Sequence, residues 1–165
     1  MQEMLSQSSW WLLLQSESAQ FSGKWLFETS VKTMNVWAVG GQAAAIYYPQ
    51  DEMALQAFLR WLPQSVPVFF LGLGSNVLMA DGTIPCVFIV LTHGFKQLAL
   101  GSDRLEVGAG LACAKLARYA EQHQLPAMGF FSGIPGTIGG ALAMNAGAFG
   151  GETWNFVDTV ETINR

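Results

Sequence analysis

Residues Phe131 to Gly140 read FSGIPGTIGG, and residues Met144 to Glu152 read MNAGAFGGE. Apart from Glu152, both stretches lie in a run from residue 122 to 151 that is rich in glycine and contains no Asp, Glu, Lys or Arg. Such a segment has few side chains with which to form a core, and glycine costs folding entropy. Either a mostly apolar, planar ligand lies against this backbone, or the segment is a crossover that packs backbone on backbone. Composition favours the ligand and leaves both interpretations open.

A second glycine turn, Gly72-Leu-Gly-Ser-Asn76, directly follows the apolar stretch 67–71 (PVFFL). Glycines after a buried strand allow positive φ and the close approach of a ligand, and consecutive N–H groups there form an anion-binding nest. Ser75 and Asn76 add side-chain donors, so the turn suits a pyrophosphate; a plain tight turn between strands explains it equally well. Val77 stands where a GxGxxG dinucleotide fingerprint has its third glycine, which argues against a Rossmann turn.

The composition excludes several classes of protein. The 165 residues are 51% hydrophobic and 12% charged, which is too apolar for a disordered chain. Eight Lys and Arg against twelve Asp and Glu give a net charge of −4 without a basic cluster, so we expect no nucleic-acid partner.

Proline and glycine interrupt the apolar runs, so we expect no membrane span. The absence of a targeting signal predicts a cytoplasmic location. Two isolated cysteines and two isolated histidines predict reduced thiols and no metal site.

Hydrophobic periodicity predicts a chain that mixes helices and strands. Residues 1–22 are Ser/Gln-rich around WWLLL, and we expect a loosely held N-terminal extension with at most one short helix. The pair of glycines in Gly108-Ala-Gly110 predicts a turn from a strand into a helix. We expect helices over 51–62 and 111–123, strands over 67–71, 86–91, 104–110 and 156–163, and two short strands within 36–48 separated by Gly40 and Gly41.

The motifs occur in a recognisable order: GxGSNxL (Gly72 to Leu78), VGAG (Val107 to Gly110), then SGIPGTIGGA and MNAGAFGGE. The order of these motifs and their sequences resemble those of the UDP-N-acetylenolpyruvoylglucosamine reductase family, whose opening motif is similar to NVWAVGG (Asn35 to Gly41). The resemblance covers residues 23–163 and is most specific in SGIPG followed by MNAGA. It implies an α+β FAD-binding domain of the vanillyl-alcohol-oxidase/PCMH type. Its two small subdomains are expected at about 23–92 and 93–165, after the extension 1–22.

The resemblance also implies how the cofactor binds. FAD is expected to bind tightly and without a covalent bond, with its pyrophosphate on the first glycine loop and its flavin and ribityl chain on the second. The predicted cofactor-binding residues are Gly72, Leu73, Gly74, Ser75, Asn76, Val77, Leu78, Ile134, Pro135, Gly136, Thr137, Gly140, Ala143, Asn145 and Gly147.

The activity that the resemblance implies is the last step to UDP-N-acetylmuramate in peptidoglycan precursor synthesis. NADPH would reduce the flavin, the enolpyruvyl double bond of a UDP-sugar would accept the hydride, and the protein would supply a proton. The family's catalytic Arg, Ser and Glu are expected beyond residue 165, together with the substrate-binding domain. We therefore expect the chain to be an N-terminal, FAD-binding portion that is inactive without a C-terminal half. Ala38 departs from the family's opening motif, where Arg is frequent.

Two other functions stay open. One is a related flavin oxidoreductase that oxidises alcohols or sugars; such enzymes often attach the flavin through His or Cys in the first glycine loop, and Gly72–Leu78 contains neither. The other is an inactive truncated remnant or interaction module that retains the flavin-binding fold. The remnant predicts no flavin binding and no turnover when a complementing C-terminal piece is supplied.

Overall fold

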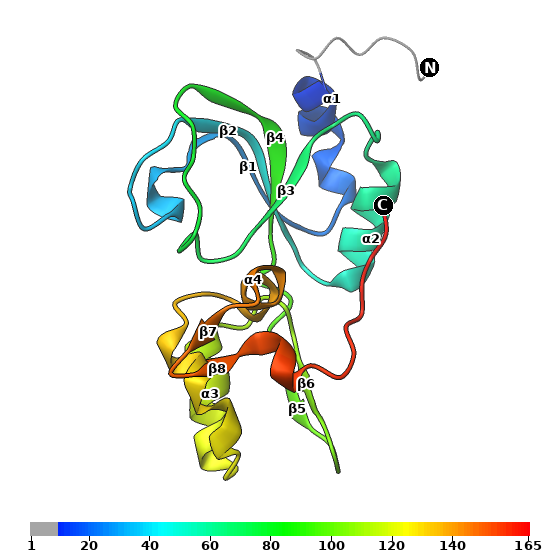
Figure 1. Cartoon of the computed structure of the whole chain (residues 1–165). Helices are drawn as coiled ribbons and strands as arrows, with labels where there is room; N and C mark the ends of the chain where they lie inside the picture. The colour runs from blue at the N-terminus through cyan, green and yellow to red at the C-terminus, as the bar shows by residue number, and fades with distance from the viewer. Residues whose placement is uncertain (1–9) are drawn as a thin grey trace.

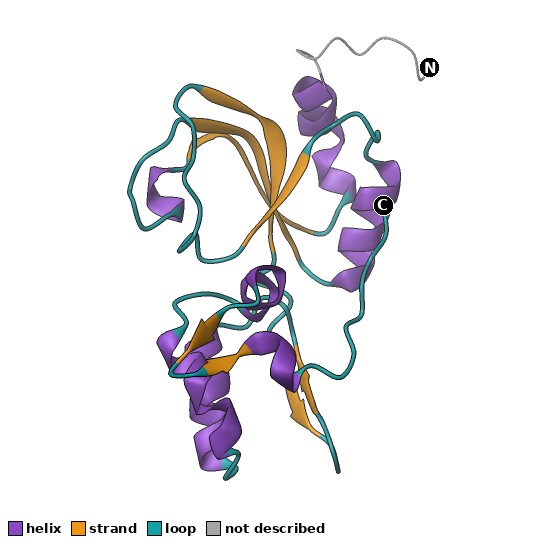
Figure 2. Cartoon of the chain, viewed as in Figure 1, coloured by secondary structure: helices purple, strands orange, loops and turns teal. Residues whose placement is uncertain are grey.

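The computed structural model describes residues 10–165, which form two parts joined near Leu91 (Figure 1). The first part is a four-stranded sheet with two helices, and the second part contains two helices and two small hairpins (Figure 2). The elements of the first part are α1 (Trp10–Glu17), β1 (Gly23–Ser30), β2 (Gln42–Pro49), α2 (Glu52–Trp61), β3 (Val68–Leu71) and β4 (Thr83–Val90). Those of the second part are β5 (Leu98–Leu100), β6 (Leu105–Val107), α3 (Cys113–Gln122), α4 (Ile138–Met144), β7 (Gly147–Ala148) and β8 (Gly151–Glu152).

The large sheet has the strand order β1-β2-β4-β3. Strand β1 pairs with β2 in antiparallel fashion, whereas β2, β4 and β3 run parallel to one another. Residues 43–47 of β2 are all buried, as expected for a strand that is covered on both faces. Because β3 ends at Leu71, the Gly72 turn begins at the carboxyl end of the parallel strands, which is the usual place for ligands in such sheets.

Local sequence explains the two longest helices, and both predictions are confirmed. Helix α2 begins after Asp51, whose carboxylate accepts a hydrogen bond from the Ala54 N–H at 2.8 Å. Its apolar face buries Leu55, Phe58 and Leu59, at the spacing of one helical stripe. Helix α3 buries Cys113, Leu116, Ala117 and Ala120 in the same way.

An aromatic cluster fills the core between the sheet and the helices α1 and α2. The Phe58 ring lies 5.4 Å from that of Phe21, 5.2 Å from that of Trp25 and 5.0 Å from that of Tyr47, mostly edge to face. A second core covers the other face of the sheet around Ile46 and Phe88, and a third lies in the second part around Leu116. The two parts therefore have separate cores.

The expectation of a loosely held N-terminal extension is wrong for residues 10–17. Helix α1 buries Trp10 and Leu14 in the same core as Phe58. The WWLLL run is thus a packing surface, because its large apolar side chains complete the cover over the sheet. Residues 1–9 lie outside the described part of the chain. No helix among residues 10–165 is both long and apolar enough to cross a membrane.

Four further elements differ from expectation. Only the second of the two strands expected within 36–48 forms, while β1 was missed because its side chains are mostly half-exposed and show no clean alternation. Helix α4 was missed within the glycine-rich segment. The strand expected over 156–163 does not form: residues 157–165 run without a ladder partner (Figure 2), and an alternating pattern does not form a strand without a neighbouring backbone.

The burial of one face of α1 predicts that substitutions of two leucines in the same helical turn differ in their effect on stability. Leu14→Ala should destabilise the fold by about 2–5 kcal/mol, because it leaves a cavity in the core. Leu12→Ala, at a side chain that is 60% exposed, should change stability by less than about 0.5 kcal/mol. Urea unfolding followed by circular dichroism measures both. Equal effects of the two variants would show that α1 is not part of the core.

Candidate functional site

The two glycine loops meet where the two parts of the molecule join. A Cβ atom added to Gly72 would lie 2.7 Å from Thr137 Oγ1, and one added to Gly136 would lie 3.7 Å from Ser75 Oγ. These loops are separated by about sixty residues of sequence and belong to different cores. Figure 1 shows α4, which follows the second loop, directly beside the carboxyl end of the large sheet. The fold thus brings together the two segments that were predicted to bind one ligand.

The first loop, residues 72–78, rests on the segment before β2. Gly74 has a φ of +70°, and a Cβ there would overlap the Met34 carbonyl. The Val36 N–H donates to the Gly74 carbonyl oxygen at 3.2 Å. Because the loop lies this close to the supporting backbone, only glycine fits at position 74.

Asn35 organises that supporting segment from a buried position. Its Nδ2 donates to the carbonyl oxygens of Val31 at 3.0 Å and Val39 at 2.8 Å, and its Oδ1 accepts from the Trp37 N–H at 3.1 Å. A buried amide with all of these partners holds the loop in one conformation. Asn35 belongs to the NVWAVGG motif, but the sequence alone assigned it no role. Its position shortly before the pair Gly40-Gly41 was the only feature that could have indicated one.

The VGAG turn supports the second loop. Gly139 N–H donates to the Ala109 carbonyl at 2.8 Å, Ile138 N–H to the Leu111 carbonyl at 2.9 Å, and Cys113 N–H to the Gly136 carbonyl at 2.9 Å. Gly108-Ala-Gly110 is the strand-to-helix turn that was expected, and its backbone carries the start of α4. Order in the glycine-rich loop therefore comes from backbone hydrogen bonds together with the packing of Ile134 and Ile138 in the core of the second part.

Helix α4 begins and ends with side-chain and backbone caps. Thr137, which is 3% exposed, accepts a hydrogen bond from the Gly140 N–H through Oγ1 at 3.3 Å. At the other end Asn145 has left-handed φ and ψ of 44° and 48°, and its N–H donates to the Ala141 and Leu142 carbonyls. Asparagine is one of the few residues that accept this conformation at a helix end. The MNAG sequence thus turns the chain back at that point.

Glycines 136 and 140 are not required by the protein's own packing. Neither has positive φ, and a Cβ at either position would make only ordinary contacts, at 3.7 Å and 3.5 Å. By contrast, a Cβ at Gly74 would overlap the Met34 backbone, and one at Gly72 would displace the Thr137 hydroxyl. Glycines at positions 136 and 140, where a methyl group would fit, are consistent with a ligand that approaches the backbone closely. The room at Gly136 and Gly140 is the feature of the site that fits a flat cofactor.

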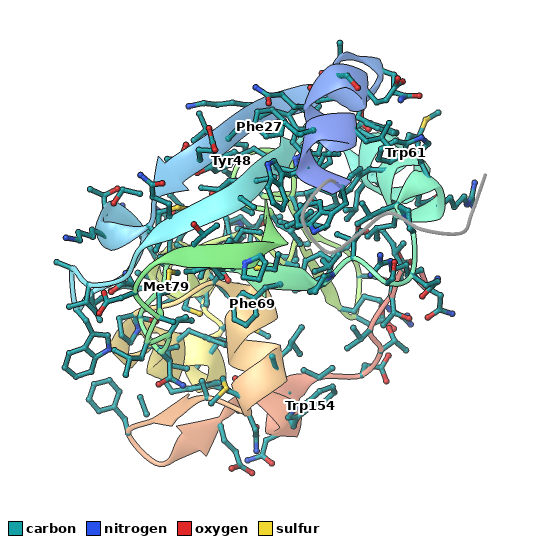
Figure 3. The ribbon with its side chains drawn as sticks, turned by 90° about the horizontal axis from the view of Figure 1, so that it is seen from above. Phe27, Tyr48, Trp61, Phe69, Met79 and Trp154 are labelled. Atoms are coloured by element: carbon teal, nitrogen blue, oxygen red, sulfur yellow. The ribbon has the colours of Figure 1, made fainter. Side chains whose placement is uncertain are left out.

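The surroundings are mostly apolar. Leu73, Leu78 and Met144 are 49%, 77% and 60% exposed, and an open depression of about 430 Å³ beside Leu78 is lined by Val39, Met79, Ala80 and the charged Asp81. Trp154 lies beside α4 (Figure 3). Of the fifteen predicted residues, Gly74, Ile134 and Thr137 are buried, Gly72, Ser75, Val77 and Gly136 are half-buried, and Leu73, Asn76, Leu78, Pro135, Gly140, Ala143, Asn145 and Gly147 are exposed.

Neither glycine loop, 72–78 or 131–147, contains a Cys, His, Asp or Glu side chain. Burial raises the pKa of the Cys86 and Cys113 thiols to about 11, so both stay protonated at neutral pH. Within the described range 10–165, no group of three His, Cys, Asp or Glu side chains could hold a metal ion. The loops offer backbone N–H groups, the Ser75 and Thr137 hydroxyls and two Asn amides. Such donors suit phosphates and the polar edge of a ring system.

Comparison with known proteins identifies the class. Residues 43–165 match the family described as "FAD binding domain", so this chain belongs to that family. Its fold is α+β, as expected.

Its more specific relatives are reductases. The chain is 46% identical over 147 residues to the UDP-N-acetylenolpyruvoylglucosamine reductase of Nitrosospira multiformis, which covers 87% of this chain and 42% of the relative. It is 47% identical over 129 residues to that of Alkalilimnicola ehrlichii, covering 78% and 43%. The crystal structure of UDP-N-acetylenolpyruvylglucosamine reductase from Thermus caldophilus superposes with a TM-score of 0.64 at 29% identity, over 79% of this chain and 44% of the other. The chain thus spans less than half the length of these relatives.

The close approach at Gly74 predicts a difference between two glycines of positive φ. Gly74→Ala should weaken the fold and the site together, because left-handed strain of about 1–2 kcal/mol adds to the overlap with the Met34 carbonyl. Gly82→Ala is the control, since Gly82 has a φ of +78° but no atom within 4 Å of an added Cβ. Urea unfolding should rank Gly74→Ala clearly below Gly82→Ala. An equal loss would mean that loop 72–78 does not rest on Met34.

Proposed function

We propose that the two glycine loops bind FAD without a covalent bond, and that the chain is the FAD-binding part of a UDP-N-acetylenolpyruvoylglucosamine reductase. The observation that carries the proposal is the contact of the loops at Gly72–Thr137 and Ser75–Gly136, beside glycines that the fold itself does not require. The family match and the reductase relatives support the same cofactor.

In this proposal the N–H groups of residues 72–78, with Ser75 and Asn76, hold the pyrophosphate, because they form a donor-rich turn without a competing carboxylate. Residues 134–137, Gly140, Ala143, Asn145 and Gly147 hold the flavin and ribityl chain. The bare backbone at Gly136 and Gly140 lets a ring system lie against it. When bound, FAD would supply hydride transfer, and this chain's residues would orient it and exclude water from one side.

The activity of the whole protein is proposed from its relatives. The hydride would come from NADPH and would pass to the enolpyruvyl double bond of UDP-N-acetylglucosamine enolpyruvate, and a proton would complete UDP-N-acetylmuramate. The groups that would bind this UDP-sugar and donate the proton are proposed to lie in a C-terminal half. A precursor pathway that uses nucleotide sugars and NADPH would place the protein in the cytoplasm.

The alternative is an inactive remnant or interaction module on the same fold. The exposed apolar side chains around the site, such as Phe70 and Leu78, are consistent with a surface that contacts another protein segment. This alternative shares the fold with the first proposal and differs from it in predicting no bound flavin.

The decisive experiment is a titration of the purified 165-residue chain with FAD, followed by flavin fluorescence, with circular dichroism as the folding check. Saturable quenching by a folded chain supports the cofactor site. A folded chain that fails to bind FAD contradicts it and favours the remnant. Adding a C-terminal piece from one of the reductase relatives and assaying NADPH oxidation then separates a reductase portion from a flavin-binding remnant.

The bare glycines predict opposite effects on stability and on binding. Gly140→Ala should stabilise the free chain by about 0.5–1 kcal/mol, because alanine is the better residue within α4. The same methyl group should weaken FAD binding at least tenfold, because it occupies the space that the ligand needs. Gly129→Ala is the matched control, as an added Cβ there meets no atom within 4 Å and Gly129 is outside the predicted site. Unchanged FAD affinity in Gly140→Ala would remove this residue from the site.

A further inference from the structure

We infer that Trp154 is a positioning residue for the cofactor loop, because it fastens the end of α4 and the following turn with two hydrogen bonds. Its indole Nε1–H donates to the Leu142 carbonyl oxygen at 3.0 Å, and its backbone N–H donates to Asn145 Oδ1 at 3.0 Å. The expected effect of Trp154 on FAD rests on the proposed function. That Trp154 holds the end of α4 rests on these two hydrogen bonds alone.

The hairpin of β7 and β8 brings Trp154 to this place. Phe149 and Gly150 both have positive φ, at 53° and 83°, which is the signature of the tight turn that reverses a hairpin. After the hairpin, Thr153 donates to the Ala146 carbonyl through both its N–H at 3.0 Å and its Oγ1 at 2.7 Å. The chain therefore returns across the end of the helix in one fixed register.

The indole of Trp154 supplies a hydrogen-bond donor at the C-terminal end of α4. The last carbonyl groups of an α-helix lack partners within the helix. At Leu142 the only other donor among residues 10–165 that comes close is the Asn145 N–H, at a long 3.3 Å and shared with Ala141. The indole N–H gives the Leu142 carbonyl a second hydrogen-bond donor. The backbone N–H of Trp154 binds the Asn145 side chain. One bond thus satisfies the last turn of α4, and the other restrains the side chain of the left-handed Asn145.

Packing alone does not fix the position of Trp154. Its side chain is 49% exposed beside α4 (Figure 3), so about half of the residue stays open to solvent. The hydrogen bond from the indole N–H to the Leu142 carbonyl adds a directed contact to this partial packing. A tryptophan held by its donor group in this way fits a role in setting the geometry of residues 142–147.

The test compares Trp154→Phe with Trp61→Phe in the 165-residue chain. Phenylalanine at 154 keeps an aromatic ring and the backbone bond but loses the indole donor. Trp61 is a partly buried tryptophan packed on the first core, so its variant controls for general loss of stability. FAD affinity, the visible absorption band of bound flavin, and amide hydrogen exchange of residues 141–147 are measured at a temperature where all three chains are folded.

We expect Trp154→Phe to raise the Kd for FAD about fivefold, as loss of one net hydrogen bond does, to shift the flavin band, and to speed exchange of residues 141–147. Trp61→Phe should change none of these while lowering the midpoint of unfolding. Unchanged exchange in Trp154→Phe overturns the fastening. Faster exchange with unchanged FAD affinity and flavin band overturns the positioning role. If the unsubstituted chain does not bind FAD, the proposed function fails, and exchange still decides the fastening.

Discussion

The contact between Gly72 and Thr137 is the constraint on which the site depends. Gly72 directly follows β3 and Thr137 begins α4, so this contact brings together loops that belong to the two separately packed parts. A Cβ at Gly72 would push the Thr137 hydroxyl away from its hydrogen bond with Gly140. The absence of one side chain therefore lets two loops from different cores form one surface.

Glycine has two distinct roles in this molecule. Gly72 and Gly74 are constrained by the protein itself, because a Cβ would displace the Thr137 hydroxyl at the first and overlap the Met34 backbone at the second. Gly136 and Gly140 are not constrained in this way, because a Cβ at either position would make only ordinary contacts. Natural proteins keep such destabilising residues where function needs them. The distinction separates residues that build the site from residues that a ligand would touch.

Several parts of the fold were predictable from local sequence. Helix α2 follows from Asp51 and its apolar stripe, and strand β3 follows from PVFFL before a glycine turn. Helix α4 was not predictable by propensity, because backbone bonds from Gly139 and Ile138 to the VGAG turn set its start. The burial of Trp10 and Leu14 was missed for a related reason: its cause is a sheet face formed by distant residues.

The sequence by itself determined the class of the protein and singled out the two glycine segments of the proposed site, since ordered glycine motifs leave a local and specific signature. Only the tertiary structure decided that the segments meet, which glycines the fold could do without, and that Trp154 reaches the Asn145 turn. These facts depend on contacts between residues far apart in the chain, or on the register of a hairpin. No local pattern encodes such distances, because packing and loop closure set them together.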